Sequence, residues 1–239
     1  MTAETTTRTD VPASQTLSRG IRVLEILADS QRPLTLDDVA SELSVHRSIA
    51  YRLVRTLEFH GLVSRDSSGV ISIGPGIAAL AAGVAPDLQA EARRELGAAA
   101  DDLGTTCFLT VHSRDECVAL VSVEPRNATA ALAQRPGTRH SVAKGAPGRA
   151  ILSLIPESEW PADVPASVRK DVRDLAARGF AISHDEVIPT VQSVAVPLAL
   201  RGRQPAALGV VYVGSTHSAE AIAERLNRAA AAIRRALGG

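Results

Sequence analysis

Two short stretches of the chain contain residues whose types and spacing could recognise a charged partner. Residues 45–63 include three arginines and two histidines against one acidic residue, although the whole chain is neutral. Residues 144–148 are rich in glycine, so their backbone N–H groups can approach a ligand closely. Because free N–H groups at the start of a helix attract anions, this second stretch suits a carboxylate. The basic stretch suits a nucleic acid.

The sequence lacks the residue patterns of common enzymes and metal sites. Its six histidines are scattered, and none shows the i, i+4 spacing of a helical zinc site. It contains no G-x-S-x-G elbow and no phosphate-binding P-loop. The His-Asp-Glu run at 184–186 could join a metal site with distant partners, so a metal-binding protein is one alternative. We expect no catalytic residue, no metal and no cofactor.

The length allows one large or two ordinary domains, and the composition indicates no membrane span. The chain has 239 residues, of which 45% are hydrophobic, enough for a sizeable core. No apolar run reaches the roughly 18–20 residues that a span needs, and residues 1–16 are typical of a polar, disordered tail rather than a signal peptide. A turn at 114–115 would place Cys107 opposite a residue near Ser122 and not opposite Cys117. We therefore expect reduced thiols and a cytoplasmic protein.

Residues 17–76 have the pattern of a winged helix-turn-helix. Apolar spacing predicts helices at 17–28, 36–43 and 46–60, followed by a β-hairpin built from 62–66 and 70–73. Thr35 is a good N-cap for the second helix. The apolar positions of the first helix predict that its buried face consists of Leu17, Ile21, Leu24, Leu27 and Ala28.

The third helix of this domain is expected to contact DNA. A helix enters the major groove with its first turn nearest the base edges, so Arg47 should reach bases while Arg52 meets phosphate. The residues expected at the DNA interface are Arg19, Thr35, His46, Arg47, Ser48, Ile49, Tyr51, Arg52 and Arg65. The alternative is a solvated basic face on a small helical bundle.

Gly74-Pro75-Gly76 marks a domain boundary. Residues 77–86 are small and apolar, which predicts a linker helix able to pair across a dimer. Residues 87–239 alternate between helical and strand patterns and predict an α+β domain on an antiparallel sheet. Its expected helices are 87–103, one after a glycine loop within 144–155, 168–178 and 219–237. Its expected strands are 105–113, 117–124, 129–134, 193–200 and 205–214.

Over residues 17–237 the chain resembles the IclR family of bacterial transcription regulators. The matching stretches are LSRGIRVLEIL, RSIAYRLVRTLEFHGLV, IGPGI, GAPGRAIL and RGFAISHDEVIPTVQSVAVPL, in the family's order and spacing. The resemblance implies that 87–239 form a GAF-like effector-binding domain. It also implies a palindromic operator in double-stranded DNA, a homodimer or dimer of dimers, and a small-molecule effector that is commonly an organic or aromatic acid. The chain departs from the family's pattern at two positions. The family usually has a threonine where this chain has Ile49, and a glycine where it has Thr190.

The resemblance also implies where the effector would bind. The matching positions are Gly145, Ala146, Ser183, Ser193, Val211 and Tyr212. Because side chains alternate along a strand, either Val211 with Val213 or Val210 with Tyr212 should face the ligand. The alternative is a purely structural glycine turn beside a strand serine. Asp185 and Glu186 could contact the ligand or be charges of a surface turn, and we favour surface charges.

We therefore expect a ligand-responsive DNA-binding regulator, a repressor released or modulated by a small organic acid, aromatic acids included. The alternatives are a GAF-like enzyme that binds a small molecule, or the metal-binding protein noted above.

Overall fold

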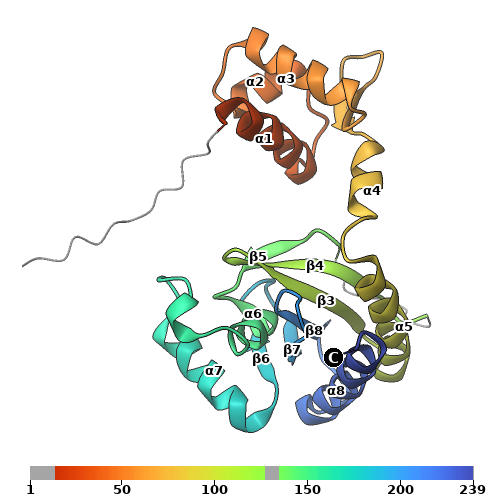
Figure 1. Cartoon of the computed structure of the whole chain (residues 1–239), viewed down its shortest axis with the longest axis vertical. Coiled ribbons are helices and arrows are strands. Elements are labelled where there is room, and N and C mark those ends of the chain that lie inside the picture. Colours follow the sequence, from red (N-terminus) through yellow and green to blue (C-terminus); the bar gives the residue numbers. More distant parts are fainter. Residues whose placement is uncertain (1–13, 127–134, 239) are drawn as a thin grey trace, which may run out of the picture. The chain divides into compact units, whose positions relative to one another are not determined.

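The computed structural model describes residues 14–126 and 135–238, which belong to two compact units, Met1–Val84 and Ala85–Gly239. Most elements of the two units are labelled in Figure 1, and each unit is described by itself. Most of the expected tail and the strand expected at 129–134 lie outside the described residues. In the described part of the chain, no helix is long and apolar enough to cross a membrane.

The described residues of the first unit form the predicted winged helix-turn-helix, followed by a short helix. Its elements are α1 (Gln15–Asp29), α2 (Leu36–Glu42), α3 (Arg47–Phe59), β1 (Val63–Arg65), β2 (Ile71–Ile73) and α4 (Gly76–Ala81). β1 and β2 pair antiparallel, with Val63 opposite Ile73. Leu34 bridges Ile71, which ties the hairpin to the segment before α2. The wing is therefore attached to the helices by backbone hydrogen bonds as well as by the shared core.

Local residues determine the boundaries of these elements. The Thr35 side chain accepts from the Asp38 N–H, and the Asp38 carboxylate accepts from the Thr35 N–H at 2.8 Å, which is a capping box. Ser44 has φ +52°, a left-handed conformation that permits the tight turn between α2 and α3. After the hairpin, a Cβ on Gly76 would lie 2.7 Å from the Gly61 carbonyl oxygen, so only glycine fits there.

The predicted buried face of α1 was wrong in part, because Leu24 and Leu27 pack against the core as expected and the other members of that face do not. Leu17 and Ile21 are 63% and 48% exposed, whereas the buried residues of α1 are Gly20, Val23 and Ile26. Two neighbouring apolar stripes run along this helix, and both satisfy helical spacing. Periodicity identifies the helix, but contact with α2, α3 and the hairpin decides which stripe is buried.

The expected linker helix at 77–86 is shorter than predicted. α4 ends at Ala81, and Pro86 begins the next helix, because a proline in the first turn removes only an N–H that would lack a helical partner. Leu80 and Val84 are 66% and 47% exposed within the single chain.

The described residues of the second unit form a six-stranded antiparallel sheet with helices on both faces (Figure 1). The strand order is β5-β4-β3-β8-β7-β6. The strands are β3 (Thr106–Ser113), β4 (Glu116–Val123), β5 (Arg139–Ser141), β6 (Ala181–His184), β7 (Gln192–Leu198) and β8 (Ala206–Tyr212). The helices are α5 (Pro86–Leu103), α6 (Gly145–Leu152), the 3-10 turn η1 (Glu157–Glu159), α7 (Ala166–Arg178) and α8 (Ala219–Ala236).

Each face of this sheet has its own apolar core. α5 and α8 pack on one face against residues such as Leu109, Val196 and Leu208. α6 and α7 pack on the other face against small residues such as Ala195 and Ala207. Small side chains on the second face let α6 approach the strands closely, which positions the candidate ligand pocket.

Several short elements were not predicted from the sequence. β5 and β6 are edge strands of three and four residues, too short for an alternation pattern to stand out. The predicted glycine loop is itself helical, because α6 begins at Gly145. These differences matter for function, since β6 and the first turn of α6 both contribute to the pocket.

The two cysteines are free and buried. Cys107 lies opposite Val123, one residue from the expected partner, because a bulge at Leu109 and Thr110 shifts the register of β3 against β4. Burial raises the pKa of both thiols to about 12, so both are protonated and chemically quiet at neutral pH.

Candidate DNA-binding surface and ligand pocket

Helix α3 presents a basic side to solvent. Its buried residues are Ala50, Leu53, Val54 and Leu57. The exposed residues at its N-cap and along its outer side are His46, Arg47, Ser48, Ile49, Tyr51, Arg52 and Arg55. None of these exposed side chains is acidic, so α3 offers a positive surface of the width that a major groove accepts.

Side-chain contacts order the first turn of α3. His46 is the N-cap, and its Nδ1 lies 2.8 Å from the Ser48 hydroxyl and accepts from the Ser48 N–H at 3.3 Å. Arg47 Nε lies 2.6 Å from an Asp37 carboxylate oxygen on α2, with both side chains well exposed. An exposed ion pair of this kind contributes little stability, so Arg47 can exchange Asp37 for a nucleic acid partner at small cost.

Three other residues expected at the DNA interface also have contacts within the protein. The Thr35 hydroxyl donates to Asp38 at 2.6 Å as part of the α2 cap. Arg65 on β1 turns toward Glu58, with Nε 3.3 Å from the carboxylate. Arg19 is partly buried on α1. Contact of these three with DNA therefore stays a prediction, and for Thr35 and Arg65 a structural role is visible.

The second candidate site is a small cavity of about 30 Å³ on the α6 face of the sheet. It is lined by Phe108, His140, Gly145, Pro147, Ser183, Glu186, Val187, Ile188, Val191, Ser193 and Val211. Four residues expected at the effector site lie here, namely Gly145, Ser183, Ser193 and Val211. The lining is mainly apolar with a few polar groups, as in sites for small molecules.

Strand register brings these residues together. Ser183 on β6 lies opposite Ser193 on β7, and Ser193 lies opposite Val211 on β8. Directly opposed side chains of an antiparallel sheet share one face. Side-chain alternation left open whether Val211 or its neighbours Val210 and Tyr212 face the ligand, and in the structure Val211 faces this cavity. Tyr212 packs in the core on the opposite face and does not line this cavity, so its place in the effector site stays a prediction.

The first turn of α6 has no free N–H at its two leading residues. The Gly145 N–H donates to Glu186 Oε2 at 2.9 Å, and the Ala146 N–H donates to the Ser183 hydroxyl at 2.9 Å. Gly145 has φ +76°, which glycine adopts readily. The expectation of an open glycine loop is thus corrected, because side chains from β6 and from the segment after it fill these positions.

Glu186 is also the partner of a buried arginine. Arg149 on α6 is 5% exposed and donates through both terminal nitrogens to the two Glu186 oxygens, at 2.7 and 2.8 Å. Its Nε donates to Asp171 on α7 at 2.9 Å. The expectation that Glu186 is a surface charge was therefore wrong, while Asp185 is exposed as expected. The available signal was an arginine within the otherwise apolar run of α6.

Two further polar groups of the cavity differ in their hydrogen bonding. The Ser193 hydroxyl is buried and has no hydrogen-bond partner among the described residues. The His140 Nδ1 lies 3.0 Å from the Ser141 carbonyl oxygen, and burial lowers the pKa of His140, which keeps the ring neutral. Since unpaired buried hydroxyls are costly, Ser193 is the natural hydrogen-bonding point for a bound molecule.

The segment between β6 and β7 forms one wall of the cavity. Asp185 and Thr190 near its two ends both have left-handed backbones, with φ +60° and +65°. The Asp185 carboxylate accepts from the Thr190 N–H. Val187 and Ile188 line the cavity yet are 42% and 39% exposed, so this wall is thin.

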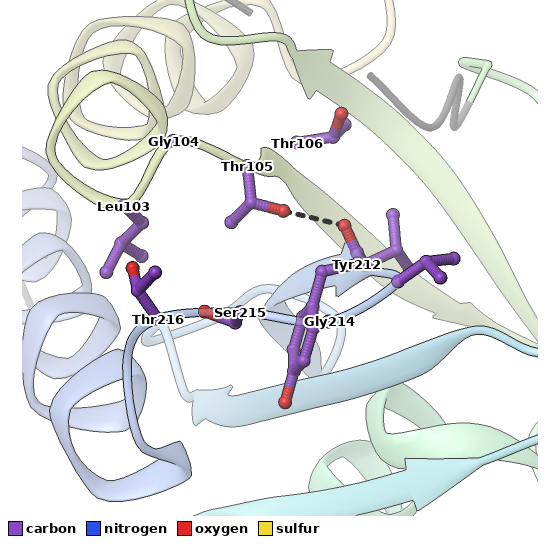
Figure 2. Close-up of a pocket in the computed structure, with 10 residues that line it drawn as sticks. Leu103, Gly104, Thr105, Thr106, Tyr212, Gly214, Ser215 and Thr216 are labelled. Carbon is purple, nitrogen blue, oxygen red and sulfur yellow. Dashed lines mark hydrogen bonds between the residues drawn. The ribbon is translucent and has the colours of Figure 1, made fainter. Parts of the chain in front are cut away.

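A larger and more open cavity of about 610 Å³ lies at the start of β3 and the end of β8 (Figure 2). Tyr212 and Val213 line it, and the Thr105 hydroxyl donates to the Val211 carbonyl oxygen at 2.8 Å. Thr106 contributes a buried hydroxyl without a hydrogen-bond partner in the described residues. Val211 lies between the two cavities and lines both.

No group of three potential metal-ligating side chains was found among the described residues. The His-Asp-Glu run is divided between two environments. His184 lies 2.9 Å from Asp185 on the surface, whereas Glu186 points to Arg149.

Comparison with known proteins supports the helix-turn-helix assignment and the overall fold. Residues 16–67 match the family model of the IclR helix-turn-helix domain. The transcriptional regulator BhcR of Paracoccus denitrificans is 27% identical over 221 residues, which is 84% of this chain and 77% of BhcR. The IclR transcriptional regulator from Alicyclobacillus acidocaldarius superposes with a TM-score of 0.82 at 27% identity, over 94% of this chain and 99% of that one.

The fold also matches an IclR homologue from Microbacterium hydrocarbonoxydans that was solved in complex with 4-hydroxybenzoate. Its TM-score is 0.80 at 22% identity, over 93% of this chain and 99% of that chain. The helix-turn-helix match, the whole-chain relatives and the exposed basic helix agree, and the relatives named here are regulators rather than enzymes. The chain is therefore a DNA-binding transcriptional regulator that carries an IclR helix-turn-helix domain.

Proposed function

We propose that this regulator is a repressor whose affinity for its operator changes when a small organic acid binds the second unit. Residues 17–76 act as the DNA-binding domain, 77–86 as the linker and 87–239 as the effector-binding domain. The protein acts in the cytoplasm, where it binds a palindromic operator as a homodimer or a dimer of dimers. A two-fold protein presents two α3 helices to two half-sites, which is why the operator should be palindromic.

The observation that supports DNA binding most directly is the outer side of α3. Its side chains are exposed and basic, and a hydrogen-bonded cap orders its first turn. The apolar surface at Leu80 and Val84 supports assembly, because the single chain leaves both residues exposed.

The cavity on the α6 face supports the proposed class of effector. Phe108, Val191 and Val211 offer an apolar wall, while Ser193 offers an unpaired hydroxyl. The related fold that holds 4-hydroxybenzoate supports a small acid with an apolar body. The bound acid would favour one relative placement of the two units and so change how the paired α3 helices meet their half-sites.

The test measures DNA binding with and without candidate effectors. Fluorescence anisotropy with duplexes tiling the DNA upstream of the protein's own gene should identify one operator that binds more tightly than a scrambled duplex. A panel of small carboxylates, including 4-hydroxybenzoate, is then titrated into the complex. Release of the operator by one acid supports the proposal. Equal affinity for operator and scrambled DNA would contradict specific binding, and an operator affinity that no acid changes would contradict control by a small acid.

A further inference from the structure

Glu186 places a carboxylate at the N-terminus of α6, where an acidic ligand was expected to bind. One Glu186 oxygen accepts from the Gly145 N–H and from Arg149, and the other accepts from Arg149. A carboxylate held by a helix N-terminal N–H and by a two-pronged arginine contact is bound in the way proteins bind anionic ligands. The Glu186 carboxylate of the protein itself therefore occupies the anion position at the start of α6.

The charges around this position disfavour a second anion. Arg149 supplies one positive charge, while Glu186 and Asp171 supply two negative charges. The Ala146 N–H is also taken, by Ser183. An acid entering while Glu186 stays in place would meet repulsion and find neither N–H free.

The cavity in its present form is also too small for an effector. Its volume of about 30 Å³ suits roughly one water molecule, whereas sites for small molecules typically enclose about 300 Å³ or more. The wall that must move is the segment carrying Glu186, Val187 and Ile188. Among the described residues, the hydrogen bonds that tie this segment to α6 are those of Glu186, and its other hydrogen bonds join residues between Asp185 and Val191.

The cavity nevertheless has one unsatisfied group that points to a ligand. Ser193 is 7% exposed, and its hydroxyl lacks a partner within the described ranges. It lies opposite Ser183, whose hydroxyl accepts from the Ala146 N–H of α6. A ligand that enters when Glu186 leaves would thus reach both the start of α6 and the Ser193 hydroxyl.

We infer that Glu186 is a specificity-determining residue, which an acidic effector must replace at Gly145 and Arg149 before the pocket opens. The inference rests on the proposed function and adds to it the reason for acid selectivity. A carboxylate can exchange for the Glu186 carboxylate without leaving Arg149 unpaired in the interior. A neutral ligand offers no such exchange, so Glu186 and its segment stay in place.

The test compares 4-hydroxybenzoate with 4-hydroxybenzamide by calorimetry on wild type, Glu186→Gln and Asp171→Asn. Glu186→Gln removes the competing charge and should raise the affinity for the acid by about tenfold, because a neutral amide binds Arg149 more weakly than a carboxylate does. Affinity for the amide should change less than about twofold. Asp171→Asn is the matched control. It removes the negative charge that pairs with the Arg149 Nε but leaves the Glu186 carboxylate on the Gly145 N–H.

Hydrogen exchange on wild type gives a second readout that does not depend on a variant folding. Saturating 4-hydroxybenzoate should speed exchange in residues 185–190, and the amide should not. The inference is overturned if Glu186→Gln binds the acid no better than wild type, if Asp171→Asn gives the same gain, if no protein binds the acid, or if the acid slows exchange in 185–190. Operator binding is measured in parallel. If the acid replaces Glu186 but the affinity for the operator does not change, the proposed function is contradicted while the role of Glu186 stands.

Discussion

Gly148 allows α6 to lie close enough to the preceding segment for its first turn to form the pocket. A Cβ added at Gly148 would overlap the Val142 carbonyl oxygen and lie 2.9 Å from the Val142 carbonyl carbon. Both contacts are with backbone, so no side chain can rotate away. Gly148→Ala should therefore displace α6, which also carries Gly145, Ala146 and Arg149.

The expected effect on stability is the difference between two opposing contributions. Alanine is favoured over glycine in a helix interior by about 1 kcal/mol. Overpacking of a buried site costs about 1–3 kcal/mol, and contact with a rigid carbonyl places this case at the upper end. The net expectation is destabilisation by about 2 kcal/mol. With a typical urea dependence of about 2 kcal/mol per molar, the unfolding midpoint should fall by about 1 M.

Gly97→Ala is a matched control in the same unit. Gly97 lies within α5, and a Cβ there would lie 4.0 Å from Val123 Cγ1, an ordinary contact. This change should stabilise the unit by about 0.5–1 kcal/mol, because alanine is favoured over glycine in a helix and no overpacking opposes it.

Tryptophan fluorescence can follow both variants during urea unfolding. Trp160 is the only tryptophan, and its Nε1 donates to the Leu152 and Ile155 carbonyl oxygens at 3.2 and 2.9 Å, at the end of α6. The probe therefore reports on the second unit. A Gly148→Ala midpoint equal to or above that of wild type would refute the close-approach argument, as would a Gly97→Ala loss as large as the loss in Gly148→Ala.

Three further predictions concern DNA binding, assembly and the pocket. Arg47→Ala should weaken operator binding by about 1–3 kcal/mol and relax sequence preference, whereas Arg52→Ala should weaken operator and scrambled duplexes alike; anisotropy that shows neither loss would remove the assignment. Light scattering at micromolar concentration should show at least a dimer, because Leu80 and Val84 are exposed in the single chain, and a 25 kDa monomer would contradict this. Thr190→Gly should stabilise the second unit by up to about 1 kcal/mol in urea unfolding, because it relieves a left-handed backbone at a β-branched residue; a loss of stability would argue against that strain.

The basic side of α3 could be predicted from the sequence because it depends on local information. Helical spacing separates Leu53, Val54 and Leu57 from the arginines, and Thr35 with Asp38 determines where the preceding helix begins. The order of helices and hairpin then identifies the winged helix-turn-helix. The same reasoning was wrong for α1, where two stripes have the same period and only packing against neighbouring elements chooses between them.

The pocket depended on tertiary structure for its most informative contacts. The resemblance to the family already pointed to Gly145, Ser183, Ser193 and Val211. The family usually has a glycine at the position of Thr190, which agrees with the left-handed backbone found there. The pairing of Arg149 with Glu186 joins residues 37 positions apart, and no local pattern predicts which surface charge folds inward. The sequence by itself therefore determined the kind of regulator and the residues near its sites. Only the folded sheet decided that a carboxylate of the protein itself fills the end of the pocket, because strand register and the approach of α6 bring these distant groups within hydrogen-bond reach.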